Sequence, residues 1–202
     1  MPKPAALQHG SYYHIFNRGN NRENVFKEER NYGYFLQLYA RHITGIADTY
    51  AYCLLRNHFH FLVRIKTEDE IEILKASKSL KAASPSQQFG NLFNAYAKAI
   101  NNAYGRTGSL FQNPFGRILV SSDAHFLNLV AYIHQNPEKH GFVDDYRDWP
   151  YSSYDALRSS KPTHLSRQPV LDWFNGLEDF DNYHDRYKDH SSIEYLVGDD
   201  AS

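Results

Sequence analysis

Hydrophobic residues recur along the chain with two different periods, and these separate predicted helices from predicted strands. Apolar positions spaced three and four residues apart, as in 28–44, indicate one face of an amphipathic helix. Alternation of side chains in 58–65 is instead typical of a strand. The predicted strands are 11–17, 46–55, 58–65 and 115–120, and the predicted helices are 28–44, 68–80, 88–103 and 123–136.

The order strand, helix, strand, strand, helix, strand predicts an α+β fold with a ferredoxin-like antiparallel sheet and helices on one of its faces. The helix at 123–136 is additional to this pattern. Ser122 is its expected N-cap, and Pro137 is expected to end it because proline disfavours helical geometry in the residue before it. Residues 82–86, which contain Pro85, are expected to form a loop.

The size of the chain fits a single domain, residues 1–160, followed by an extension, residues 161–202. No stretch reaches the roughly 20 apolar residues of a membrane-spanning helix, and the N-terminal segment lacks the apolar core of a signal peptide. Cys53 is the only cysteine, so no disulfide can form within the chain. We therefore expect a cytoplasmic protein that does not bind membranes.

Charge is divided unevenly along the chain. From residue 170 onward there are nine acidic and two basic residues, a charge of −7. The preceding 169 residues hold 14 acidic and 20 basic residues, a charge of +6, so the net charge of −1 is the sum of two unlike parts. A mildly basic body can bind a polyanion such as nucleic acid. Aromatic side chains can stack on bases, although most of them are expected to belong to the core.

The predicted strand 58–65 begins with a pair of histidines. His58 and His60 are two residues apart, so both imidazoles project from the same face of the strand, where they can grip one divalent ion. The same spacing also fits two solvent-facing or hydrogen-bonded histidines. Spacing alone favours this second interpretation, because the chain has 11 histidines and a chance pair is unremarkable.

The helix at 123–136 supplies a phenol and a carboxamide that share one face. Tyr132 and Asn136 are four residues apart, so they lie one turn from each other and can converge on a metal held by the histidines. The alternative is a structural tyrosine packed on the sheet and an asparagine that caps the helix. Without further information the structural alternative is favoured.

Four segments in fixed order resemble the HUH single-tyrosine transposases, in particular the REP-associated tyrosine transposases of the IS200-like group. They are YHIFNRG (13–19), NHFHFLV (57–63), GRTGSLFQ (105–112) and YIHQNP (132–137), and the resemblance covers roughly residues 9–154. Three departures from the family pattern occur. Leu55-Arg56 replaces Met-Pro, residues 113–117 keep one positive charge in a typically basic segment, and Glu138-Lys139 replaces Val-Arg.

The resemblance reverses the two structural interpretations above. It implies that His58 and His60 are metal ligands, that Tyr132 is the nucleophile and that Asn136 completes the metal site. It also implies a catalytic domain at 1–160 with a ferredoxin-like fold, and hairpin DNA as the substrate class. The acidic extension has no counterpart in the family pattern.

The residues themselves support a covalent mechanism for such an enzyme. A tyrosine phenol can attack a backbone phosphate to form a 5′-phosphotyrosine, and the released 3′-hydroxyl can later reverse the step. We hypothesise that Mg²⁺ or Mn²⁺, held by His58, His60 and Asn136, polarises the phosphate. Gln135 is a substitute ligand only if the helix is rotated, and His134 is a weak candidate for a general base.

Basic residues in or beside the matching segments are candidates for contacts with single-stranded or hairpin DNA. Each of them also fits an ordinary solvated surface charge. The candidates are Arg18, Arg22, Lys98, Arg106 and Arg117.

Two further functions stay open at this point. A non-catalytic nucleic-acid-binding regulator with the same fold fits the near-neutral net charge, and a metal-dependent phosphodiesterase that uses water as its nucleophile fits the metal site. A monomer and a homodimer are both compatible with the sequence. Tyr132 can therefore meet the histidines of its own chain or those of a partner.

Overall fold

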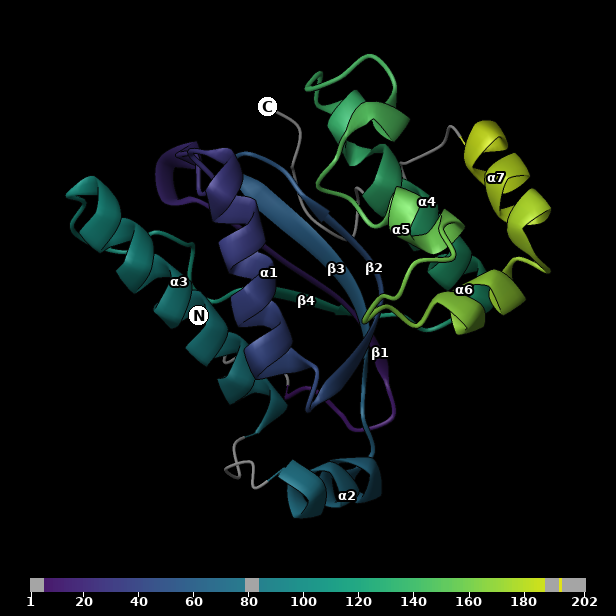
Figure 1. Cartoon of the computed structure of the whole chain (residues 1–202), viewed down its shortest axis with the longest axis horizontal. Coiled ribbons are helices and arrows are strands. Elements are labelled where there is room, and N and C mark those ends of the chain that lie inside the picture. Colours follow the sequence, from purple (N-terminus) through teal and green to yellow (C-terminus); the bar gives the residue numbers. More distant parts are fainter. Residues whose placement is uncertain (1–5, 79–83, 188–192, 194–202) are drawn as a thin grey trace.

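A four-stranded antiparallel sheet forms the centre of the protein (Figure 1). The computed structural model describes residues 6–78 and 84–187 together with Ile193. The strands are β1 (Tyr12–Arg18), β2 (Ala47–Leu54), β3 (His58–Ile65) and β4 (Gly116–Leu119), in the order β2-β3-β1-β4. With α1 (Glu29–Ile43) after β1 and α3 (Pro85–Tyr104) before β4, this order confirms the predicted ferredoxin-like fold.

The two faces of the sheet are covered by different helices (Figure 1). On one face, the ring of Phe59 lies 5.1 Å from Phe35 of α1 and 5.4 Å from Phe93 of α3, measured between centroids. His60 is the next residue on β3 and points to the opposite face, where α4 (Asp123–Lys139) lies. The additional helix therefore packs on the face that the ferredoxin-like helices leave open.

Helix α4 continues through Pro137 to Lys139, so the prediction that it ends at Asn136 is wrong. Proline lacks only its own N–H, and the residues after it still satisfy the last carbonyls of the helix. The N–H of His140 bonds the carbonyl of Asn136 at 3.0 Å, and the N–H of Phe142 bonds that of Pro137 at 2.9 Å. One missing donor in the last turn therefore does not end this helix.

Helix α3 begins at Pro85, so the predicted loop at 82–86 is wrong at that end. Proline suits the first position of a helix, where its missing N–H has no partner in any case. Ser84 caps this end by accepting the N–H of Gln87 at 3.3 Å. Residues 79–83, which include the end of the helix predicted at 68–80, lie outside the described residues, and α2 spans Glu68–Lys78.

The segment after α4 folds back beside that helix and the edge of the sheet (Figure 1). Bridges from Ser152 to Cys53 and from Leu165 to Thr49 cover the outer edge of β2. Buried Phe180 joins the same hydrophobic core as the sheet. The short elements of the described chain are η1 (Asn20–Arg22), η2 (Tyr146–Asp148), α5 (Tyr154–Arg158), α6 (Arg167–Trp173) and α7 (Leu177–Arg186). The last part of the predicted acidic extension, 188–192 and 194–202, lies outside the described residues.

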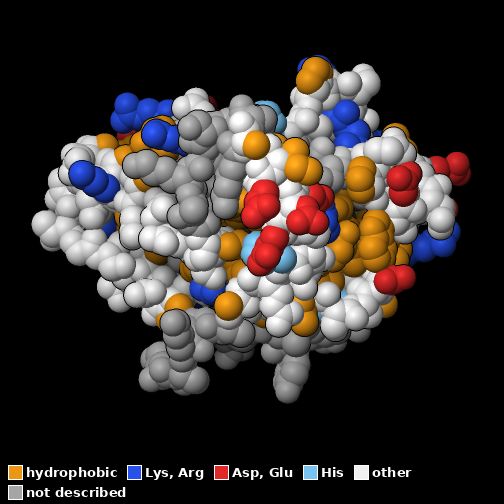
Figure 2. Space-filling model, turned by 90° about the horizontal axis from the view of Figure 1, so that it is seen from below, with side chains coloured by type: hydrophobic (Ala, Val, Ile, Leu, Met, Phe, Trp, Pro, Cys, Tyr) orange, Lys and Arg blue, Asp and Glu red, His pale blue; other side chains and the backbone are white. Residues whose placement is uncertain are grey.

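Acidic side chains gather on the face of the molecule at which α2 lies (Figure 2). Glu68, Asp69 and Glu70 occupy the first turn of this helix, where their charge suits the helix dipole. A polyanion is disfavoured on this face, so nucleic acid is expected elsewhere on the protein. None of the helices in the described part of the chain is long and apolar enough to cross a lipid bilayer.

Candidate active site

His58 and His60 are buried side by side on the central strand β3. Their side chains are 3% and 1% exposed, and their ring centroids lie 5.1 Å apart. Because β3 is hydrogen-bonded to β1 on one side and β2 on the other, the backbone of this pair is fixed from both edges. The burial excludes the solvent-facing interpretation of the two histidines.

Each of these histidines is oriented by a hydrogen bond at Nδ1. The Nδ1 atom of His58 lies 2.7 Å from the side-chain oxygen of Asn57, which can only accept, so Nδ1 carries the proton. The Nδ1 atom of His60 lies 2.9 Å from Nε2 of His14, a third buried histidine on β1. Partners of this kind typically fix the ring orientation of metal-binding histidines and direct Nε2 toward the metal.

The buried environment keeps both imidazoles neutral. Burial, with smaller contributions from the neighbouring His140 and Arg18, lowers the pKa of His58 to about 3, while the amide of Asn136 acts in the opposite direction. Burial also lowers the pKa of His60 well below its usual value. Neutral imidazole is the form that binds a divalent metal, so these side chains are in their binding state at physiological pH.

Helix α4 brings Tyr132 and Asn136 to the same place. Both side chains are fully buried, and the ring of Tyr132 lies 5.7 Å from that of His60 between centroids. The Nδ2 atom of Asn136 donates to the backbone carbonyl of Tyr132 at 3.1 Å, and the amide of Asn136 also interacts with His58. The predicted convergence of the four side chains is therefore present.

Two buried atoms of this cluster fit a metal ion. His58 Nε2 and Asn136 Oδ1 are buried, and neither makes a hydrogen bond of standard length and angle with the described residues. Burying a polar atom in this way costs about 1–3 kcal/mol, which a bound cation would offset. In the described ranges, no three His, Cys, Asp or Glu side chains are grouped to hold a metal. The donor set that fits is a pair of histidines with a carboxamide.

A family model matches the part of the chain that contains these residues. The model described as "Transposase IS200 like" matches residues 7–136, a span that contains both histidines, Tyr132 and Asn136. The chain belongs to the IS200-like transposase family.

Two individual proteins resemble this IS200-like transposase. The "Putative REP-associated tyrosine transposase" of Haemophilus influenzae is 30% identical over 112 residues, which cover 53% of this chain and 58% of the relative. The chain thus matches little more than half of that relative's length. A solved structure of a REP-associated tyrosine transposase bound to a REP hairpin has a TM-score of 0.60, with 16% identity over 80% of this chain and 88% of the other. The similarity to the solved structure shows that the two proteins share a fold.

The predicted DNA-contacting residues of this transposase do not form one group. Arg18 pairs with His58 across the β1–β3 ladder, and Arg22 is exposed just beyond it. Lys98 is exposed on α3, and Arg117 packs over the ring of Phe115 at 3.9 Å on the α3 face of the sheet. Arg106 is held by Glu23 and by Asn101, whose Oδ1 atom accepts from it at 2.8 Å. Of the five predicted DNA-contacting residues, Arg18 and Arg22 therefore lie at the end of the sheet that carries the histidine pair.

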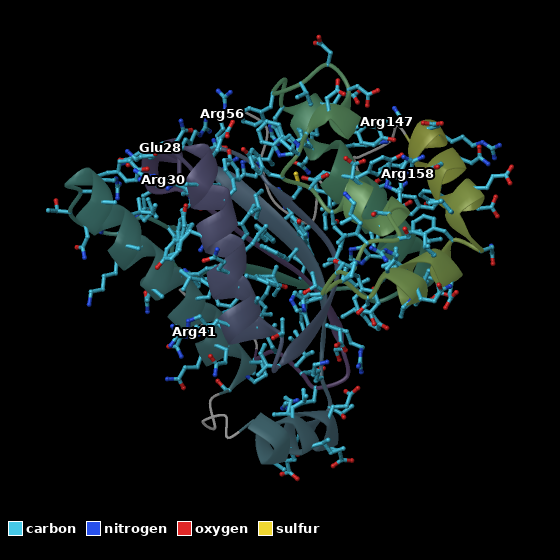
Figure 3. All side chains as sticks on the ribbon, viewed as in Figure 1. Glu28, Arg30, Arg41, Arg56, Arg147 and Arg158 are labelled. Atoms are coloured by element: carbon cyan, nitrogen blue, oxygen red, sulfur yellow. The ribbon has the colours of Figure 1, made fainter. Side chains whose placement is uncertain are left out.

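Several residues around the site were missed in the sequence. Lys139 and His140 follow Tyr132 by seven and eight residues, a helical spacing that was hidden by ending the helix at Asn136. The His140 ring lies 4.9 Å from that of His58. Exposed Arg56 lies in the β2–β3 turn, over the ring of Phe142 at 5.6 Å (Figure 3).

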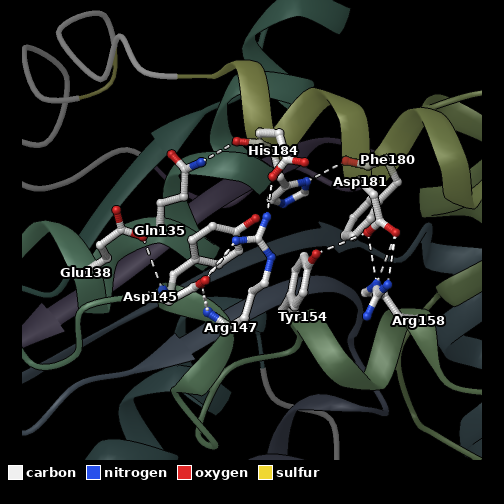
Figure 4. A network of polar contacts seen from close by, with 11 residues as sticks. Gln135, Glu138, Asp145, Arg147, Tyr154, Arg158, Phe180, Asp181 and His184 are labelled. Carbon is white, nitrogen blue, oxygen red and sulfur yellow. Dashed lines mark hydrogen bonds and ion pairs between the residues drawn. The ribbon is translucent and has the colours of Figure 1, made fainter.

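Gln135 points toward α7 (Figure 4). His134 is directed to the same helix by its contact with His184. The Nε2 atom of Gln135 donates to the backbone carbonyl of His184 at 2.6 Å. His134 uses both ring nitrogens, one toward His184 and one toward Ser153, each at 2.8 Å. Neither residue is placed to serve as a metal ligand or as a general base for Tyr132.

Proposed function

We propose that this IS200-like transposase is a metal-dependent endonuclease and strand transferase that cuts and rejoins single-stranded DNA beside a hairpin. The observation that carries the proposal is the convergence of Tyr132 and Asn136 of α4 on the buried pair His58 and His60. A cytoplasmic location is part of the same proposal, because the DNA substrate lies there. The buried, unpaired thiol of Cys53 is compatible with a reducing compartment.

His58, His60 and Asn136 are the residues that would hold Mg²⁺ or Mn²⁺. Their neutral imidazoles and amide oxygen form a mixed nitrogen and oxygen donor set that suits either ion. When bound, such an ion supplies Lewis-acid polarisation of a phosphate. Asn57 and His14 keep the two imidazoles oriented through hydrogen bonds at Nδ1.

Tyr132 is the proposed nucleophile. Its phenol oxygen forms a bond to phosphorus as the bond from phosphorus to the 3′ oxygen breaks, which leaves a 5′-phosphotyrosine. The phenol gives up one proton, and the departing 3′ oxygen takes one up. Because the phosphate stays a diester, now linked to Tyr132, a 3′-hydroxyl can reverse the step and rejoin the strand.

The proposed DNA path approaches the end of the sheet at which His58 begins β3. Arg18 and Arg22 at the end of β1, with Arg56 in the β2–β3 turn, would contact phosphates there. Lys98 and Arg117 belong to the same proposal as contacts farther along the α3 side, whereas Arg106, which is held by Glu23 and Asn101, is left out of it. Support for a hairpin substrate comes from the solved relative, which is bound to a REP hairpin.

The deciding experiment looks for a covalent protein–DNA adduct. The purified protein is incubated with hairpin oligonucleotides taken from the DNA that flanks its gene, with Mn²⁺ or with EDTA, and its intact mass is measured. We expect an adduct that requires the metal and is absent in Tyr132→Phe. Tyr34→Phe is the matched control, because Tyr34 is an exposed residue of α1 on the other face of the sheet.

Each alternative gives a different result in this experiment. Tight binding without adduct or cleavage would identify a non-catalytic regulator. Cleavage without an adduct, unaffected by Tyr132→Phe, would identify a phosphodiesterase that uses water. Either outcome would overturn the proposal.

A further inference from the structure

Lys139 lies on the same face of α4 as the proposed nucleophile. It follows Tyr132 by seven residues, or nearly two helical turns, and the helix reaches it because it continues through Pro137. The ammonium nitrogen of Lys139 lies 5.0 Å from the centroid of the Tyr132 ring. This nitrogen is enclosed by protein, although the side chain as a whole is half-buried. The end of the lysine side chain is therefore inside the site and not in bulk solvent.

The same ammonium group also adjoins the histidine pair. Its positive charge acts on both His58 and His60, and Arg18 adds a second charge of the same sign at His58. The cluster of nucleophile and metal-binding residues is thus bordered by fixed positive charge. A site with this electrostatic character attracts an anionic group of the substrate.

We propose that Lys139 binds a non-bridging oxygen of the scissile phosphate and offsets the negative charge that develops there during attack by Tyr132. The proposal rests on the proposed function, because it names a further catalytic residue for that reaction. Tyr132 forms its bond to phosphorus and the 3′ oxygen leaves, while Lys139 keeps its protons throughout. A preorganised cation in a dry site stabilises such charge far better than one in water.

Substitutions of Lys139 separate its charge from its shape. We expect Lys139→Met to slow adduct formation by about 10²- to 10³-fold, the usual effect of removing one such group. Lys139→Arg keeps the charge and should stay within about tenfold of the unmodified protein. Lys27→Met is the matched control, because Lys27 lies 5.3 Å from the Tyr104 ring on the far face of the sheet and should not change the rate.

A methylphosphonate at the scissile position provides the sharper test. This linkage has no negative charge, so a residue that neutralises the phosphate has nothing to offset. We expect the defect of Lys139→Met to shrink to within about threefold on this substrate, since only the electrostatic contribution is removed. An equal defect on both linkages would show that Lys139 acts only on the fold, and would overturn the inference.

The outcomes distinguish this inference from the proposed function. If the unmodified protein forms no adduct, the proposed function fails and with it the basis of the inference. If the unmodified protein forms the adduct and Lys139→Met forms it at the same rate, the proposed function stands and the inference is wrong. Thermal unfolding of each variant, compared with Lys27→Met, identifies a loss of activity that comes from misfolding.

Discussion

His134 of α4 donates from Nδ1 to Nε2 of His184 on α7, across 2.8 Å. The direction follows from the far end of the chain of contacts, where Nδ1 of His184 faces the carbonyl of Phe180 at 2.7 Å and must donate to it. The hydroxyl of Ser153 completes the chain by donating to Nε2 of His134 at 2.8 Å. Hydrogen bonds of the neutral, buried imidazoles of His134 and His184 thus hold α4, the helix that carries Tyr132, against α7.

This arrangement predicts loss of stability in acid. Burial lowers the pKa of His184 to about 4, whereas an unfolded histidine titrates near 6.5. As the pH falls below about 6.5, His184 becomes protonated in the unfolded chain but stays neutral in the folded chain. The free energy of unfolding therefore decreases until about pH 4, where the folded chain also binds the proton. One such histidine contributes a slope of up to about 1.4 kcal/mol per pH unit. His184→Gln should flatten the slope by about this amount in urea titrations at several pH values.

The control for this prediction is His164→Gln. His164 is exposed, so its removal should leave the pH dependence of unfolding unchanged. Some slope will persist in His184→Gln, because burial also lowers the pKa of His14, His58, His60 and His134. Identical slopes for His184→Gln and the unmodified protein would contradict the assignment of a neutral His184.

Patterns within one element predicted the central part of the site. Alternation along β3 places His58 and His60 on one face of the strand, and helical spacing places Tyr132 and Asn136 on one face of α4. These periods follow from backbone geometry alone, so tertiary structure does not alter them. Pro137 shows the limit of such rules, because its local preference is outweighed by the hydrogen bonds of the residues that follow. The rule hid the part of the helix that carries Lys139.

Contacts between distant segments could not be predicted in the same way. His14 reaches His60 only because β1 lies next to β3, a pairing that no local pattern contains. Asp181 belongs to the segment that its composition marks as an acidic extension. In the structure it forms an ion pair with Arg158 at 2.9 Å, and the described part of the extension packs against α4 (Figure 4). Net charge along the sequence does not reveal such pairing.

Asn57 should control the affinity of the proposed metal site through His58. Its side-chain oxygen accepts from Nδ1 of His58, which keeps the lone pair on Nε2. We expect Asn57→Ala to weaken Mn²⁺ binding by about 10- to 100-fold, the usual effect of losing an outer partner of a ligand. Asn57→Asp keeps the acceptor and should retain the affinity. Calorimetric titration with Mn²⁺ measures both, and equal affinities for Asn57→Ala and the unmodified protein would refute this role.

Gly19 should be intolerant of any side chain, because the backbone approaches it too closely. A Cβ atom at this position would lie 2.2 Å from the backbone oxygen of Glu23. Its N–H also bonds the carbonyl of Asn57 at 2.8 Å, so strain here reaches the residue before His58. We expect Gly19→Ala to cost about 1–3 kcal/mol of stability, as other overpacked sites do.

Gly33 is the control for Gly19, because it lies in α1 with open space around its Cα. Gly33→Ala should raise the free energy of unfolding by up to about 1 kcal/mol, since alanine is the better helix former. Denaturant unfolding of the two variants gives both values. Stabilisation by both substitutions would show that the unfolded state, and not the close approach at Gly19, determines the result.

Arg106 joins two segments that are far apart in the sequence, which predicts a role in stability. Its guanidinium contacts Glu23 of the loop before α1 and donates to Oδ1 of Asn101 on α3 at 2.8 Å. The Arg106 side chain is 14% exposed and that of Glu23 is 44%, so we expect a coupling of up to about 1 kcal/mol in a double-mutant cycle.

Because Arg106 is occupied by Glu23 and Asn101, its donors are directed at protein and not at DNA. Arg106→Ala should therefore leave the salt dependence of hairpin binding unchanged, whereas Arg18→Ala should reduce the slope of log K against log salt by about one. A reduced slope in Arg106→Ala with no coupling to Glu23 would instead assign Arg106 to the DNA.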